Sequence, residues 1–131
     1  MGVVTEQVEA ALTGADAVLI ESNHDEDMLR YGPYPVYLKR RILSERGHLS
    51  NESCAALAAR LAGSGTKKII LGHLSRENNR PELALAAAER AVKGAAALYC
   101  AKKKHLLLAL YCAPPLGFLR LPVGKAEPCF A

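Results

Sequence analysis

Histidines in short polar segments are the residues of this sequence best suited to chemistry. His48 and His73 each stand in a Gly-His-Leu-Ser segment, and His24 follows Glu21 within the run Glu-Ser-Asn-His-Asp. Glycine and serine neighbours suit a loop that directs an imidazole into a cleft better than they suit a core. An imidazole changes charge near neutral pH and is a common metal ligand, and a positioned carboxylate can orient it for proton transfer. These segments predict acid–base or metal chemistry.

Each candidate also has a purely structural interpretation. His24 can cap a helix that begins near Asp25, and His105 follows three lysines, which is typical of a solvated loop residue. The basic run Lys39-Arg-Arg41 is typical of a solvated helix face. Only the repeated Gly-His-Leu-Ser context favours function over structure, and it does so for the two histidines that share it.

The elements that must position these residues alternate between helices and short buried strands. Apolar runs predict strands at 17–20, 68–71 and 106–112, and capping residues with helical apolar spacing predict the helices between them. The predicted helices cover 5–12, 36–46, 52–62 and 81–93. This alternation predicts an α/β layered domain, in which ligands bind outside the carboxyl ends of the strands. Glu21 and His73 both fall at such ends.

Composition and charge limit the classes of protein to consider. A chain of 131 residues forms about one domain, and its net charge of +4 is only a weak bias toward anionic partners. The four cysteines form no CxxC pair, and the N-terminus has no basic, apolar leader. The apolar stretch 106–119 is too short to span a bilayer and contains two prolines. We therefore expect a reduced, cytoplasmic protein without a membrane segment.

Five successive segments carry a resemblance to a known family. They are Glu21-Ser-Asn-His-Asp25, Met28-Leu-Arg-Tyr-Gly-Pro-Tyr-Pro35, Leu38-Lys-Arg-Arg-Ile42, Gly47-His-Leu-Ser-Asn51 and Gly72-His-Leu-Ser-Arg-Glu-Asn-Asn79. In this order they resemble the C-terminal half of the metallo-β-lactamase-fold hydrolases of the YycJ, WalJ or VicX type. The resemblance runs from Gly2 to about Leu85. It implies half of an αββα sandwich over residues 1–94, followed at 95–131 by a divergent tail with one last strand and a loop.

The resemblance also implies a mechanism and a set of site residues. The family is similar to two-metal hydrolases, of the phosphodiesterase or DNA exonuclease kind, whose divalent Zn or Mn ions activate water and hold the ester. His73 matches its last metal-binding histidine. By similarity to the tRNA 3′-processing and β-CASP nucleases, Glu21 and His48 match a catalytic pair whose imidazolium protonates the leaving alkoxide. The remaining candidates would shape the pocket or meet substrate phosphates: His24, Asn51, Lys39, Arg40 and Arg41.

The sequence departs from the family in its main metal-binding segment. The family's His-x-His-x-Asp-His cradle, a further His and an Asp are absent, and the two closest histidines, His24 and His48, are 24 positions apart. Met1-Gly-Val-Val-Thr aligns with the residues just after the missing Asp. Zinc normally takes at least three protein ligands, so His73 alone cannot hold a two-metal site. We therefore expect a partial fold that lacks its N-terminal half, is inactive alone and self-associates through an uncovered sheet face.

Two functions of other classes stay open. In the first, the chain is a non-catalytic nucleic-acid-binding or interaction module that uses the basic residues 39–41, which predicts steeply salt-dependent DNA binding without metal. In the second, it is a metal-independent hydrolase that uses Glu21 and His48 alone, which predicts activity that resists chelators.

Overall fold

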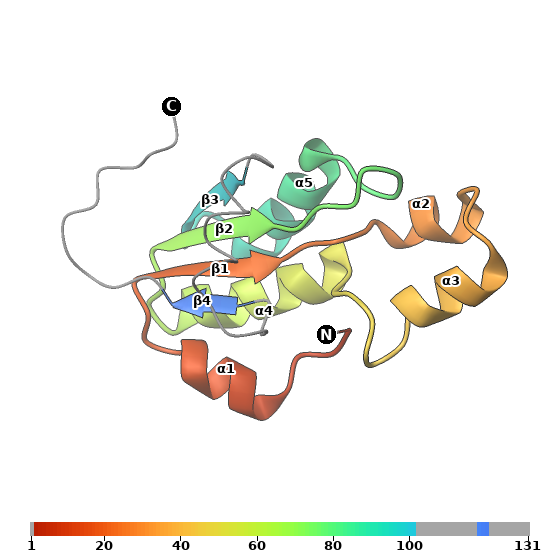
Figure 1. The fold of residues 1–131 in the computed structure, drawn as a ribbon. Coiled ribbons are helices and arrows are strands. Elements are labelled where there is room, and N and C mark those ends of the chain that lie inside the picture. Colours follow the sequence, from red (N-terminus) through yellow and green to blue (C-terminus); the bar gives the residue numbers. More distant parts are fainter. Residues whose placement is uncertain (1, 102–117, 121–131) are drawn as a thin grey trace.

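The computed structural model describes residues 2–101 and 118–120 (Figure 1). The elements are, in chain order, α1 (Glu6–Leu12), β1 (Ala17–Glu21), α2 (Glu26–Tyr31), α3 (Val36–Ile42), α4 (Asn51–Gly63), β2 (Lys68–Gly72), α5 (Pro81–Val92), β3 (Ala97–Cys100) and β4 (Phe118–Arg120). The expected α/β class is confirmed. Strand β3 was not anticipated, while the predicted strand at 106–112 and His105 lie outside the described residues.

The strands form one mixed sheet in the order β3-β2-β1-β4. Strand β1 runs parallel to β2, β2 runs parallel to β3, and β4 is antiparallel to β1. The register places Glu21 opposite Gly72. Because parallel strands end at the same edge, Glu21 and the residue that follows β2, His73, come together there, as the sequence predicted.

The core lies between the sheet and the helices α4 and α5, which pack against each other (Figure 1). Leucines of α4 meet the inward side chains of β1 and β2, and alanines of both helices allow their backbones to approach closely. The main contributors, all fully or nearly fully buried, are Val18, Ile20, Leu57, Ala58, Leu61, Ile69, Leu71, Ala84 and Ala88. An apolar core that holds both central strands fixes the edge at which they end.

Side chains cap the helices at their expected starts, with one correction. Thr5 caps α1 and Ser50 caps α4, each accepting a backbone N–H three residues on. Helix α2 is capped by Asp25, whose carboxylate accepts the Met28 N–H at 2.8 Å. The interpretation of His24 as the cap is therefore wrong, because the shorter carboxylate one residue later makes this bond.

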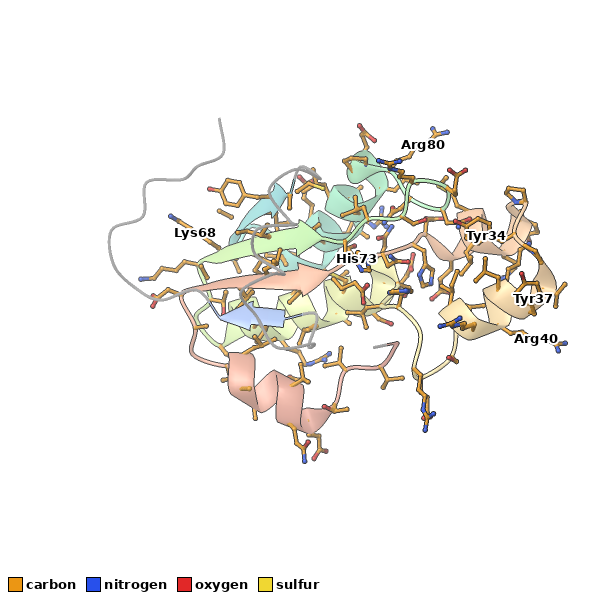
Figure 2. The ribbon with its side chains drawn as sticks, in the orientation of Figure 1. Tyr34, Tyr37, Arg40, Lys68, His73 and Arg80 are labelled. Carbon is orange, nitrogen blue, oxygen red and sulfur yellow. The ribbon has the colours of Figure 1, made fainter. Side chains whose placement is uncertain are left out.

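Helix α3 is shorter and more exposed than the sequence suggested. It ends at Ile42 instead of Arg46, has no side-chain cap and has no fully buried residue. Figure 2 shows Tyr37 and Arg40 on its outer side, at the opposite end of the molecule from Lys68. Within residues 2–101 and 118–120, no helix is long and apolar enough to cross a membrane.

Candidate active site

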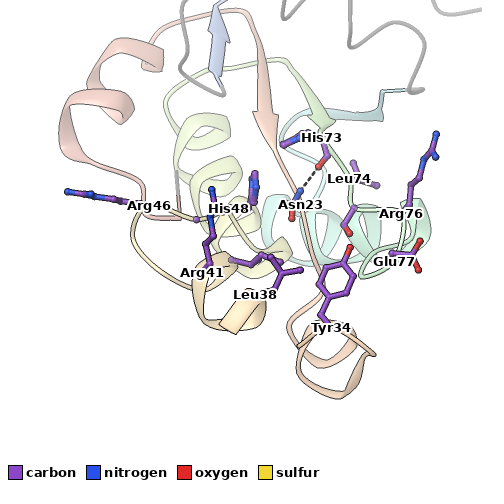
Figure 3. A pocket seen from close by; sticks show the side chains of 13 residues that line it. Asn23, Tyr34, Leu38, Arg41, Arg46, His48, His73, Leu74, Arg76 and Glu77 are labelled. Atoms are coloured by element: carbon purple, nitrogen blue, oxygen red, sulfur yellow. Dashed lines mark hydrogen bonds between the residues drawn. The ribbon is translucent and has the colours of Figure 1, made fainter. Parts of the chain in front are cut away.

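A cleft of about 810 Å³ opens beside the carboxyl ends of β1 and β2 (Figure 3). One wall comes from α3 and the turn before it, with Tyr34, Leu38 and Arg41, and the opposite wall comes from the residues that follow β2. His48 and His73 both line it. Ligands of α/β proteins bind outside the carboxyl ends of parallel strands, and the structure has a cleft at that position.

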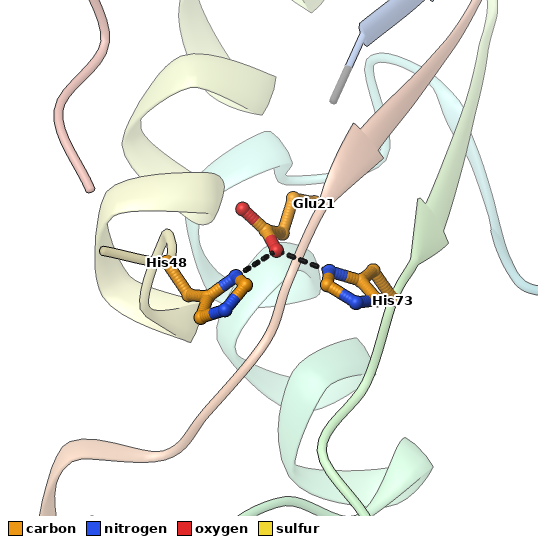
Figure 4. A group of neighbouring side chains, drawn as sticks. All are labelled: Glu21, His48 and His73. Carbon is orange, nitrogen blue, oxygen red and sulfur yellow. Dashed lines mark hydrogen bonds and ion pairs between the residues drawn. The ribbon is translucent and has the colours of Figure 1, made fainter. Parts of the chain in front are cut away.

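Glu21, His48 and His73 form a compact cluster at this edge (Figure 4). Glu21 is the last residue of β1, His48 lies in the segment between α3 and α4, and His73 directly follows β2. Their ligand-type atoms lie within 4.8 Å of one another, and the two imidazole centroids are 5.1 Å apart. The fold therefore brings together the three residues on which the sequence analysis placed most weight.

One carboxylate oxygen of Glu21 bonds both imidazole rings. His48 Nδ1 lies 2.7 Å from Glu21 Oε1, and His73 Nδ1 bonds the same oxygen. The backbone N–H of Leu49 donates to the other oxygen, Oε2, at 3.2 Å. Since an ionised carboxylate can only accept hydrogen bonds, both Nδ1 atoms carry a proton. In the neutral tautomers, the two Nε2 atoms then hold the free lone pairs, and they point away from Glu21.

These hydrogen bonds set the charges of the cluster. Burial alone would raise the pKa of Glu21, but the bonds from His48, His73 and the Leu49 N–H lower this pKa to about 2. The bond to Glu21 in turn raises the pKa of His73, although its partial burial opposes that shift. The cluster thus holds a permanent carboxylate that favours the protonated form of a partly exposed imidazole.

Asn23 ties the two histidine segments to the end of β1. Its Nδ2 donates to the His73 carbonyl at 2.8 Å, its backbone carbonyl accepts the Ser75 N–H at 2.7 Å, and its own N–H donates to the Leu49 carbonyl at 2.8 Å. His73 has φ 58°, a left-handed conformation that is uncommon for residues with a side chain. Sequence reasoning missed Asn23, although its place in the Glu-Ser-Asn-His-Asp run was the available signal.

Asn51 belongs to a buried polar network beneath the cleft. Its side-chain amide pairs with that of Asn79 through two bonds of 2.9 Å, and its Oδ1 also accepts the Ser22 hydroxyl at 2.7 Å. Asn79 Nδ2 further donates to the Ser22 carbonyl at 2.8 Å. The network joins the start of α4, the end of β1 and the loop before α5, so Asn51 supports the cluster from behind and does not line the cleft.

Of the other predicted pocket residues, Arg41 lines the cleft, and His24, Lys39 and Arg40 lie outside its lining. His24 is only 1% exposed, its burial lowers its pKa, and its backbone carbonyl accepts the Asn51 N–H. Lys39 Nζ donates to the Arg30 carbonyl at 2.7 Å and so joins α3 to α2.

Two further arginines line the cleft, Arg46 and Arg76, and the sequence analysis did not single them out (Figure 3). With Arg41 they make three arginines among the residues that line the cleft of the two imidazoles. Guanidinium groups match phosphate oxygens in charge and geometry. The signal for Arg46 and Arg76 was their proximity in sequence to His48 and His73, which becomes informative only once both loops are known to border one cleft.

The donor set is compatible with a metal ion at this cluster. A carboxylate with two imidazoles is a set found in catalytic zinc sites, but here Glu21 is already bonded by both Nδ1 atoms. Carboxylates commonly hold a metal-binding imidazole in this way, fixing its tautomer and leaving the other ring nitrogen for the metal. The residues present therefore fit a metal bound through Nε2, with Glu21 as the group that orients the ligands.

The parallel strands, with a carboxylate and two imidazoles beside their ends, define an α/β protein whose polar centre lies at the carboxyl edge of its sheet. Two relatives share much of its sequence. Exodeoxyribonuclease WalJ of Streptococcus pneumoniae is 53% identical over 83 residues, which are 63% of this chain and 31% of WalJ. Exodeoxyribonuclease YycJ of Bacillus anthracis is 48% identical over 83 residues, with the same shares of the two chains.

The resemblance to proteins of the YycJ/WalJ type is thereby confirmed over these 83 residues. The chain spans about a third of the length of the curated relatives it matches. No family model matches the sequence.

Proposed function

We propose that Glu21, His48 and His73 belong to the active site of a metal-dependent phosphodiester hydrolase that acts on DNA as an exonuclease. The supporting observation is the single carboxylate oxygen that bonds Nδ1 of both rings. The named activity of the WalJ and YycJ relatives supports the same function. The fold in which we place this site is the C-terminal half of an αββα metallo-β-lactamase sandwich in a cytoplasmic protein. It is formed by residues 1–94 together with the tail 95–131, whose strands β3 and β4 belong to the same sheet.

Glu21 and His48 act as the proton-donating pair in this proposal. Glu21 accepts a hydrogen bond from Nδ1 of His48 and so orients the ring, and in the reacting state a second proton sits on Nε2. Nε2, on the far side of the ring, then delivers its proton to the oxygen that leaves phosphorus. Arg41, Arg46 and Arg76 line the same cleft and balance the negative charge of the phosphodiester.

His73 is the metal ligand in this proposal. A divalent ion, Zn²⁺ or Mn²⁺, held by its Nε2 would activate water and polarise the phosphate when bound. Glu21 keeps the Nδ1 proton in place, so the neutral ring presents its lone pair toward the ion. The sequence contains four histidines, of which His24 is buried in the core. A two-metal centre needs more ligands than these, and we propose that the other half of the fold supplies them.

It follows that the isolated chain is inactive as a nuclease. We would test this by measuring release of nucleotides from DNA in Mn²⁺ or Zn²⁺, with the isolated chain and with a chimera. In the chimera, the matched 83 residues of the pneumococcal WalJ protein are replaced by the corresponding residues of this chain. We expect no turnover by the chain and turnover by the chimera that is lost on His48→Ala or His73→Ala.

Other outcomes would favour the rival functions. Turnover by the isolated chain that survives EDTA and needs Glu21 and His48 would indicate a metal-independent hydrolase. An inactive, correctly folded chimera that still binds DNA would indicate a non-catalytic nucleic-acid-binding module. Robust metal-dependent turnover by the isolated chain would contradict the incomplete site.

A further inference from the structure

Residues 30–46, which we call the α2–α3 surface, combine exposed aromatic side chains with cations. Tyr31 is 81% exposed and Tyr37 is 74% exposed, although both are large and partly apolar. The segment has five cationic residues and one acidic residue, giving a net charge of +4, which equals the formal net charge of the whole chain. The charged residues are Arg30, Lys39, Arg40, Arg41, Glu45 and Arg46. Residues 30–46 are therefore a strongly basic part of the chain.

Helical spacing connects this surface to the cleft. Leu38, Arg41 and Ile42 line the cleft from α3, and their spacing of three and four residues places them on one side of the helix. Tyr37 lies on the adjacent side together with Arg40 and Arg41, again three and four residues on. Arg41 thus belongs to both sides. A polyanion bound along α3 would pass from the cleft, over Arg41, to Tyr37 and Arg40 on the outer side (Figure 2).

Two more tyrosines, Tyr31 and Tyr34, belong to the α2–α3 surface. Tyr34 lies in the turn between α2 and α3 and lines the cleft (Figure 3). Tyr31 precedes Tyr34 by three residues, and Tyr37 follows Tyr34 by three. The bond from Lys39 Nζ to the Arg30 carbonyl joins the two helices that carry these tyrosines. Lys39 therefore joins α2 to α3. We assign the contacts with an anion to Arg40, Arg41 and Arg46.

We propose that the α2–α3 surface binds a single-stranded stretch of DNA, with phosphates on Arg40 and Arg41 and with bases stacked on Tyr37 and Tyr31. The inference rests on the proposed function, because the strand would lead its phosphodiester into the cleft of His48. Aromatic rings interleaved with cations are the combination that binds single strands without sequence preference. In a duplex, the base faces are covered by their neighbours, so exposed tyrosines could not stack on them. A helical protein partner would instead need a continuous apolar stripe, which the cations of α3 interrupt.

The test is the binding of a fluorescently labelled oligothymidylate, followed by anisotropy in EDTA over a series of salt concentrations. We expect Tyr37→Ala to weaken binding by about 5- to 150-fold, since a stacked base contributes about 1–3 kcal/mol, while the salt dependence stays unchanged. We expect Arg40→Ala to reduce the slope of log affinity against log salt by about 0.7, the value for one phosphate of a single strand. The two variants therefore separate stacking from charge.

An abasic oligonucleotide of the same length adds a second comparison. It keeps the phosphates and lacks the bases, so Tyr37→Ala should bind it as well as the unmodified protein does. Tyr99 and Arg90 provide the matched controls, because both are exposed and lie on β3 and α5. Tyr99→Ala and Arg90→Ala should leave affinity and salt slope unchanged. Circular dichroism of every variant verifies that it is folded.

Three results would overturn the proposal. The first is that the protein does not bind the oligothymidylate, and the second is that Tyr37→Ala binds it as tightly as the unmodified protein does. The third is that Tyr37→Ala loses as much affinity for the abasic strand as for the oligothymidylate. A second copy of the chain could also occupy this surface, and sedimentation velocity measures whether such a dimer forms. If Tyr37→Ala dissolves a dimer and leaves DNA binding unchanged, the surface is a self-association surface and the proposal is wrong.

The two proposals fail separately. Binding in EDTA needs no catalysis, so Tyr37-dependent binding with an inactive chimera would reject the hydrolase and keep the DNA-binding surface. An active chimera whose binding of single-stranded DNA is unchanged by Tyr37→Ala and Arg40→Ala would support the hydrolase proposal and reject this binding surface.

Discussion

Glu21 is the residue on which both imidazoles depend. Its single oxygen Oε1 accepts from His48 and His73, and it is only 6% exposed, so water cannot readily replace either partner. In this arrangement one carboxylate orients two imidazole rings. A change at Glu21 should therefore affect the proposed proton donor, His48, and the proposed metal ligand, His73, together.

Glu21→Gln should destabilise the protein in a pH-dependent way. The pKa of Glu21 is lowered from its ordinary 4.5 to about 2, so its stabilisation is complete above about 4.5 and is lost as the pH falls toward 2. The pKa of His73 is raised, so its contribution is complete below 6.5 and is lost as the pH rises through the raised value. The loss in Glu21→Gln should thus be largest between about pH 4.5 and 6.5, on the order of 3 kcal/mol.

Urea unfolding between pH 3 and 8 measures this difference. Glu89→Gln is the control, because Glu89 is an exposed residue of α5 away from the cluster. A pH-independent difference, or an equal one in Glu89→Gln, would show that the cluster does not carry the electrostatic stabilisation we assign to it.

Asn23→Ala should loosen the His73 segment specifically. The substitution removes the donor that holds the His73 carbonyl, at a residue whose φ of 58° is unfavourable without such support. A part-buried carbonyl left without its partner costs about 1–3 kcal/mol. We expect a loss of stability in this range, measured by urea unfolding, with faster amide exchange in residues 73–75. Asn23→Asp tests the explanation: its carboxylate cannot donate to a carbonyl, so it should not restore stability.

At the scale of elements, the sequence was informative wherever a local pattern decides the structure. The apolar runs of β1 and β2 are bounded by polar residues, so the ends of both strands, and the positions of Glu21 and His73, could be predicted. Ser50 was also recognisable, because a cap is defined by residues within one turn. The burial of His24 was not, since it depends on the tertiary structure: the N–H of its neighbour Asp25 donates to the Asn78 carbonyl in the loop from β2 to α5. Asn23 likewise acquires its role from His73, 50 residues away, and Arg76 from lining the same cleft as residues 34–48.

Gly47 positions His48 by allowing the chain to pass close to the end of α3. A Cβ at this buried glycine would overlap the carbonyl oxygen of Ile42, which is backbone and cannot rotate away. We expect Gly47→Ala to destabilise the protein by about 2 kcal/mol or more. Gly63, at the end of α4, has nothing within 4 Å of an added Cβ, so Gly63→Ala should stabilise by about 0.5–1 kcal/mol. Thermal unfolding of both variants checks the contrast, and destabilisation by both would contradict the packing explanation.

At the scale of the whole molecule, the parallel strands of a small sheet bring together polar side chains from distant parts of the sequence. The connection from β1 to β2 contains α2, α3 and α4, so the same segment that supplies His48 also builds the wall of the cleft and the α2–α3 surface. Glu21, His48 and His73 are separated by about 25 residues at each step in sequence, yet they share one oxygen atom. The proposed binding surface and the candidate catalytic centre consequently border the same cleft.

The proposal that this chain holds only part of a metal site predicts a difference in how metal affects the free energy of unfolding. A ligand stabilises the folded state by RT ln(1 + [L]/Kd), so 1 mM Zn²⁺ adds at most about 1.4 kcal/mol if the Kd is 100 µM or weaker. We expect the isolated chain to fall within this limit, since zinc normally takes at least three protein ligands and His73 is the one we assign. The chimera with WalJ should instead lose several kcal/mol on chelation. Thermal unfolding with and without EDTA measures both, using His73→Ala as the control. A stabilisation of the isolated chain well above this limit, lost in His73→Ala, would show that the 131 residues form a complete metal site by themselves.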